Sequence, residues 1–140
     1  MFKKIMLGYD GSSYAKKALS VAGDLAKKYG AQVTAVGVAH IPVFTENGEA
    51  INVIIEDTKA FLAAQLEEAK AAAAREGLKL EVRTEMGHPA EVLIRLADQE
   101  GYSLIVVGSR GLGGIQHLLL GSVSEATVRH AHCPVLVVKE

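Results

Sequence analysis

The hydrophobic pattern of the chain predicts five strands. The run Leu104–Val107 is apolar throughout, which is typical of a strand buried on both faces of a sheet. Apolar runs at Ile5–Leu7 and Val135–Val138 predict two more strands, and the valine-rich segment Gln32–Ala39 predicts a fourth. In Leu78–Glu85 apolar residues alternate with charged ones, which indicates a strand with one solvated face at the edge of a sheet.

A pattern typical of a helix begins after the strand predicted at Ile5–Leu7. Ser12 or Ser13 can cap a helix there and Gly30 can end it. The apolar and small residues of this helix form one stripe, at positions 15, 18, 19, 22, 25, 26 and 29. Residues 40–50 contain Pro42 and Gly48 and have no periodicity, so a loop is expected there.

Three further helices are predicted between the remaining strands. The second helix ends at Gly77, the third opens with Pro89 at its first position, and the short fourth helix covers residues 122–130. The second helix carries the apolar stripe Ile54, Ile55, Phe61, Leu62, Leu66 and Ala69.

The regular alternation of strands and helices predicts the fold class. Strand–helix–strand units connect with right-handed crossovers, so we expect one α/β domain over residues 1–140, with a doubly wound parallel sheet covered by helices on both faces. The expected strand order is 3-2-1-4-5. Such sheets bind ligands beyond the carboxyl ends of the strands, where the strand order reverses. Asp10 and the loop after Val107 would then face the same crevice.

Composition narrows the classes of function. The 140 residues are 49% hydrophobic and 22% charged, with a net charge of −1, which argues against binding nucleic acid or anionic membranes through bulk positive charge. A single cysteine excludes a disulfide framework within the chain and a cysteine-rich zinc site. The first apolar run stops at Asp10, too short for a signal peptide, and no run is long enough to cross a membrane. We expect a cytoplasmic protein.

A glycine-rich loop between the fourth strand and the fourth helix carries the strongest chemical signal. It is not a P-loop, because no lysine occurs between Lys79 and Lys139, and it lacks the G-x-G-x-x-G spacing. It contains instead Gly108, Gly111 and, after nine residues, Gly121 followed by Ser122.

The start of the fourth helix suits an anion. Ser122, Val123 and Ser124 offer backbone N–H groups, the serine hydroxyls add donors, and the helix dipole favours negative charge at this end. Arg110 can contact a phosphate and remains charged. Alternatively, this segment is a flexible connection whose glycines only permit turns.

These residues resemble the nucleotide signature of the universal stress protein family, in its ATP-binding branch. That signature is G-2x-G-9x-G-[ST], and the resemblance extends over the whole chain. Residues 4–12 resemble the family's first strand and aspartate turn, 87–91 the start of its third helix, and 133–138 its final strand.

The resemblance implies a set of binding residues for an adenine nucleotide, which is ATP, ADP or AMP, with Mg²⁺ held through the phosphates and weakly by Asp10. Gly8 and Asp10 would lie beside the nucleoside, and the backbone at Val38 would read the adenine edge. The loop and helix start would surround the ribose and phosphates, through Gly108, Arg110, Gly111, Gly113, Gly114, Gly121, Ser122, Val123 and Ser124. Gly37 interrupts the bulky apolar run that is usual in the family's second strand.

Other chemically capable residues have simpler interpretations. Asp10 can cap the turn that precedes the first helix, and Tyr9 can stack on a base or pack in the core. His130, His132 and Cys133 are metal-binding types, but no second cluster supplies further ligands. His117 is expected to be a solvent-facing loop residue.

The resemblance implies a nucleotide-dependent stress-response or regulatory protein with little or no turnover. A slow ATP hydrolase or adenylating enzyme is the alternative, and an interaction module with a vestigial site is a third reading. The last strand, Val135–Val138, is expected at a sheet edge, where it would pair with a second copy to form a homodimer, as in many relatives.

Overall fold

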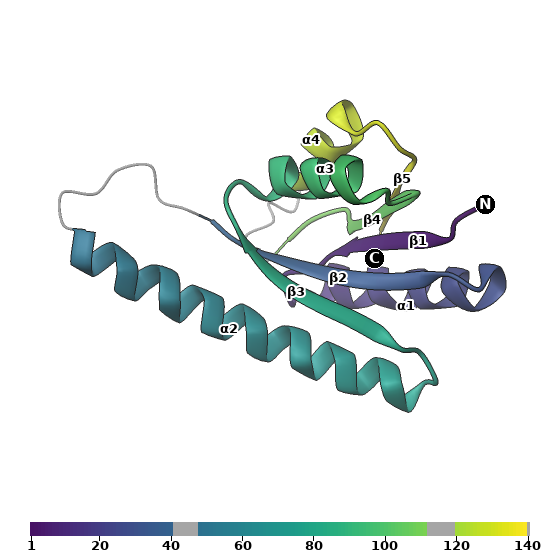
Figure 1. Ribbon diagram of the computed structural model, residues 1–140, viewed down its shortest axis with the longest axis horizontal. Helices are drawn as coiled ribbons and strands as arrows, with labels where there is room; N and C mark the ends of the chain where they lie inside the picture. The colour runs from purple at the N-terminus through teal and green to yellow at the C-terminus, as the bar shows by residue number, and fades with distance from the viewer. Residues whose placement is uncertain (41–47, 112–119, 140) are drawn as a thin grey trace.

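The computed structural model describes residues 1–40, 48–111 and 120–139. Strands and helices alternate along these ranges (Figure 1). In chain order they are β1 (Lys4–Gly8), α1 (Ser13–Tyr29), β2 (Gln32–Ala39), α2 (Gly48–Arg75), β3 (Leu80–Met86), α3 (Pro89–Glu100), β4 (Leu104–Gly108), α4 (Ser122–His130) and β5 (Val135–Val138). Each predicted strand and helix is therefore present.

The strands form one sheet in the order β3-β2-β1-β4-β5, and every neighbouring pair is parallel. This is the predicted order. The central strand β1 pairs with β2 on one side and β4 on the other, with Leu7 opposite Ala35 and Val106. Since β1 and β4 are neighbours although a long stretch of sequence separates them, the strand order reverses between them.

The helices cover both faces of the sheet. Helices α1 and α2 lie on one face and α3 and α4 on the other (Figure 1). Successive side chains of a strand point to opposite faces, so β1 sends Ile5 and Leu7 into the core under α1 and α2, and Met6 into the core under α3 and α4. All three side chains are completely buried.

Capping residues set the ends of the helices much as predicted. The Ser12 hydroxyl accepts a hydrogen bond from the Ala15 N–H at 3.1 Å, so Ser12 is the cap of α1. At the end of α2, Gly77 has a φ of +78°, and the N–H of Leu78 reaches back to the Ala73 carbonyl at 2.9 Å. This closing turn delays β3 until Leu80, two residues later than the pattern indicated.

Helix α2 departs most from the sequence prediction. It begins at Gly48, inside the segment expected to be a loop, and its 28 residues span about 42 Å. Because this is longer than the neighbouring strands, its first turns extend past the sheet (Figure 1). Ile54 and Phe61, expected on the buried stripe, are each 54% exposed, whereas Leu62 and Leu66 are buried. No helix in the described ranges is both long and apolar enough to span a membrane.

Candidate functional site

A cavity of about 460 Å³ opens at the carboxyl ends of β1 and β4, where the strand order reverses. It lies on the face covered by α3 and α4. The predicted binding residues within the described ranges all line it: Gly8, Asp10, Val38, Gly108, Arg110, Gly111, Gly121, Ser122, Val123 and Ser124. Gly113 and Gly114 lie outside the described residues.

The apolar floor of the cavity was missed by sequence reasoning. Val36 of β2, Leu93 of α3 and Val107 of β4 form it, and Pro89 lies at the rim. Gly8 allows these side chains to approach, because a Cβ at Gly8 would lie 3.0 Å from Leu93 Cδ1 and 3.1 Å from Val107 Cγ1. Val36 lies two residues before Val38 on one strand, so alternation could have identified it; Leu93 became apparent only from the packing.

The turn after β1 holds Asp10 at the mouth of the cavity. Gly11 follows it with a φ of +82°, a conformation that favours glycine. Asp10 Oδ1 accepts a hydrogen bond from the Ser12 N–H at 2.9 Å. Asp10 thus stabilises the turn, as in the simpler interpretation, and also lines the cavity, as the resemblance implied.

The motif glycines permit contacts within the protein itself. A Cβ at Gly108 would lie 2.8 Å from Tyr14 Cβ, so Gly108 lets the first turn of α1 approach the end of β4. A Cβ at Gly111 would lie 2.6 Å from Asp10 Oδ2, and one at Gly121 would lie 3.3 Å from Arg110 Cα. The sequence argument that Gly108 and Gly111 serve the approach of a ligand is therefore incomplete, because the backbone of Tyr14 already requires glycine at position 108 and the Asp10 carboxylate would have to move if position 111 carried a side chain.

The N-terminus of α4 faces the cavity. Its cap is Gly121, whose own N–H donates to the Ser109 carbonyl at 2.6 Å. The first N–H groups of a helix have no partner within the helix, and here they belong to Ser122, Val123 and Ser124. With the helix dipole, these groups make this end of the cavity suitable for an anion.

One positive side chain lines the described part of the cavity. Arg110 carries its guanidinium 6.0 Å from the centre of the Tyr14 ring, and no carboxylate of the described residues forms an ion pair with it. Asp10 is the acidic residue in the same lining. The cavity therefore has a positive group on the loop after β4, next to the α4 N-terminus, and a negative group at the β1 turn, which lies against the same loop at Gly111.

Two residues near the site belong to the opposite face of the sheet. Tyr9 is 5% exposed and packs in the core under α1 and α2, and it is also among the residues that line the cavity; stacking on a base stays a prediction. The pKa of Tyr9 is raised, mainly by burial and then by the negative charges of Glu68 and Asp10. Gly37 also faces α2, since a Cβ there would lie 3.1 Å from Leu66 Cδ1. Because Gly37 has no side chain, α2 can pack closely against β2 at this position, and the cavity is unaffected.

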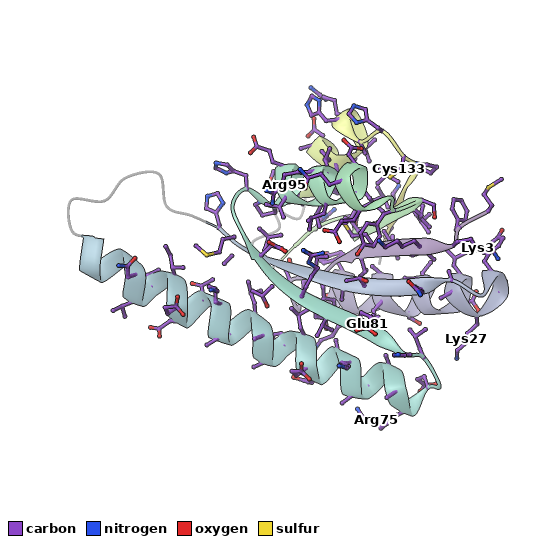
Figure 2. All side chains as sticks on the ribbon, in the orientation of Figure 1. Lys3, Lys27, Arg75, Glu81, Arg95 and Cys133 are labelled. Atoms are coloured by element: carbon purple, nitrogen blue, oxygen red, sulfur yellow. The ribbon has the colours of Figure 1, made fainter. Side chains whose placement is uncertain are left out.

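The histidine and cysteine residues near the C-terminus lie apart from the cavity. His132 Nδ1 is 2.9 Å from Asp98 Oδ2, and burial raises the pKa of the Cys133 thiol. Figure 2 shows Cys133 and Arg95 of α3 on the same side of the sheet. Within the described ranges no three His, Cys, Asp or Glu residues are grouped to hold a metal ion. His117 lies outside the described residues.

Comparison with known proteins supports the fold and the family resemblance. Residues 1–139 match the model of the universal stress protein family. Universal stress protein YxiE of Bacillus subtilis is 36% identical, with 99% of this chain and 100% of that protein covered.

Solved structures extend the comparison. Universal stress protein UspA from Lactobacillus plantarum has a TM-score of 0.91 and 22% identity, with coverage of 98% of this chain and 97% of that one, which is a similarity of fold. A universal stress protein solved in complex with cAMP has a TM-score of 0.75 and 29% identity over 99% of this chain and 97% of its own. On the full-length family match and the 36% identical relative, the chain belongs to the universal stress protein family.

Proposed function

We propose that this protein binds an adenine nucleotide, ATP by its motif, in the cavity between β1 and β4. The base and ribose occupy the end lined by Val38 and Asp10, and the phosphates lie at the N-terminus of α4 beside Arg110. One observation carries the proposal: the β1 turn, the loop after β4 and the start of α4 meet around one cavity at the reversal of the strand order. This convergence is the main argument against the third hypothesis, an interaction module with a vestigial site.

The cAMP complex of a 29% identical relative supports this assignment, because cAMP combines the same base, sugar and an anionic phosphate. The apolar residues of the lining offer a surface for a flat base, and its polar residues and the α4 N-terminus offer groups for the sugar and the phosphate.

The lining also suits Mg²⁺ bound mainly through phosphates. Magnesium in such sites keeps several waters and uses one or two carboxylates together with the substrate phosphates. Asp10 is the carboxylate available in the described lining, and its Oδ1 also accepts the Ser12 N–H. Asp10 would therefore hold the ion directly or through water, while the phosphates supply the other oxygens.

We infer that turnover is slow and that binding itself carries the function in a nucleotide-dependent stress response in the cytoplasm. Fast phosphoryl transfer needs cations at the γ-phosphate, firm metal ligands and a group that orients the attacking water. With ATP and Mg²⁺, phosphate release should stay far below the ~10 s⁻¹ median of enzymes. A rate near that median, lost in Asp10→Asn, would favour the alternative of a hydrolase.

Calorimetry on Arg110→Ala tests the position of the phosphates. We expect the affinity for ATP to fall about tenfold, about 1.4 kcal/mol, and the affinity for adenosine to stay unchanged, because adenosine has no phosphate for Arg110 to contact. Arg95→Ala, an exposed arginine of α3 outside the cavity, is the matched control. If the unmodified protein binds neither ATP, ADP, AMP nor cAMP at millimolar concentration, the proposed function is wrong.

A further inference from the structure

The backbone N–H and carbonyl of Ser109 join three segments at the base of the glycine-rich loop. Its N–H donates to the Val138 carbonyl of β5 at 2.9 Å. Its carbonyl accepts the Gly121 N–H at 2.6 Å and the Ser124 hydroxyl at 2.9 Å. Ser109 is 3% exposed and Ser124 is 2% exposed. The end of β5 and the first turn of α4 are thus both joined to the buried backbone of Ser109, directly after β4.

The chemistry of a hydroxyl limits what Ser124 can do for a ligand. A serine hydroxyl has one proton to donate. Both acceptors within reach of it, the Ser109 carbonyl and the Gly121 carbonyl at 3.0 Å, belong to the base of the loop. A phosphate dianion offers only acceptors, so a bond from Ser124 to phosphate would take this proton away from a buried carbonyl. Weakening buried hydrogen bonds has a substantial free-energy cost.

We propose that Ser124 is a positioning residue and that its hydroxyl does not bind the ligand. The hydroxyl fixes the first turn of α4 against Ser109, and this contact holds the N–H groups of Ser122 and Val123 at the cavity. Ser122, which is exposed on the same turn, remains the hydroxyl available to a phosphate. This inference rests on the proposed function and divides the serines of the motif region into one that supports the site and one that faces the ligand.

Hydrogen exchange in the ligand-free protein tests the positioning role directly. In Ser124→Ala the Gly121 amide should exchange at least tenfold faster, because the first turn of α4 has lost one of its two bonds to Ser109. Ser124→Thr keeps the hydroxyl and should restore slow exchange. Ser103→Ala is the matched control: it removes a hydroxyl bond to the Lys4 carbonyl, 3.1 Å long, and should leave the Gly121 amide unchanged.

Titrations with AMP and adenosine complete the test. Ser124→Ala should weaken AMP binding about tenfold and leave adenosine binding unchanged, while circular dichroism reports an intact fold. If Ser124→Ala weakens AMP binding but leaves the exchange of the Gly121 amide unchanged, the hydroxyl contacts the phosphate. If the exchange becomes faster but AMP binding is unchanged, the bond from Ser124 to Ser109 is dispensable for binding. Either result overturns the proposal. If the unmodified protein binds neither AMP nor adenosine, the same titrations are made with ATP; if ATP, ADP and cAMP do not bind either, the proposed function is wrong, whereas the exchange measurement still decides whether Ser124 fixes the helix start.

Discussion

At the scale of single residues, the missing side chain at Gly111 allows the carboxylate of Asp10 to lie against the loop. A Cβ at this position would lie 2.6 Å from Asp10 Oδ2. The backbone of Gly111 does not have a positive φ, so an alanine there meets no conformational obstacle of its own. The need for glycine therefore comes from a neighbouring side chain.

A double-mutant cycle can measure this contact. Gly111→Ala alone should weaken ATP binding about tenfold, because Asp10 must move away from its position at the mouth of the cavity. In an Asp10→Ala background the same substitution should reduce the affinity for ATP much less, because the Asp10 carboxylate that would clash with the new methyl group is absent. Calorimetry on the two single variants and the double variant gives the coupling energy. Equal costs in both backgrounds would contradict the contact.

At the scale of elements, the two faces of the sheet have separate tasks. Leu66 of α2 packs in the core beneath α1 and α2, and Leu93 of α3 packs in the other core and also lines the cavity. Both leucines are at most 2% exposed. The face under α3 and α4 therefore supports both the fold and most of the apolar lining of the cavity, to which the opposite core adds Tyr9 and Ala15.

This division predicts different effects of the same truncation. Leu66→Ala and Leu93→Ala should each lower the free energy of unfolding by about 2–5 kcal/mol, because each leaves a buried cavity. Only Leu93→Ala should also weaken nucleotide binding, since it removes part of the floor beneath the base. Urea unfolding and calorimetry on both variants test this, and a loss of affinity in Leu66→Ala comparable with that in Leu93→Ala would refute the division.

The two edge strands, β3 and β5, also differ in how well they are protected against pairing with another chain. In β3 the guanidinium of Arg83 pairs with Glu85 at 2.6 Å and with Glu100 of α3 at 2.9 Å. Charged side chains of this kind discourage pairing with another chain. The residues of β5 are valine and leucine throughout, so its open edge carries no such protection.

At the scale of the whole molecule, the open edge of β5 predicts a homodimer. The N–H groups of Ile105 in β4 and of Ser109, directly after β4, donate to the carbonyls of Pro134 and Val138. Residues of a parallel ladder turn their polar groups alternately to either side, so the polar groups of Val137 point to the edge away from β4. A second copy related by a two-fold axis could pair there and close the assembly.

Val137→Pro removes one outward N–H and should prevent this pairing. Proline is tolerated on an edge strand where its missing N–H faces solvent, so the monomer should still fold. Light scattering at micromolar concentration should give twice the 14.8 kDa chain mass for the natural sequence and for the matched control Val137→Ala, and one chain mass for Val137→Pro. A natural chain that measures as a monomer would disprove the dimer.

The sequence by itself determined the elements, their order in the sheet and most of the cavity lining. Buried parallel strands are continuously apolar, and crossovers have one hand, so the pattern at Leu104–Val107 and its neighbours left few topologies. The loop spacing indicated the candidate site because Arg110 and Gly111 come directly after β4. The turn at Asp10 followed from its place directly after β1.

Only the tertiary structure decided which side chains meet across elements. It placed Leu93 in the floor, turned Tyr9 and Gly37 toward α2, and left Ile54 exposed where α2 extends past the sheet. It also assigned the Ser124 hydroxyl to the Ser109 carbonyl. Local patterns record whether a residue is apolar or able to cap a helix, whereas these contacts depend on how far each helix reaches and on what packs opposite it.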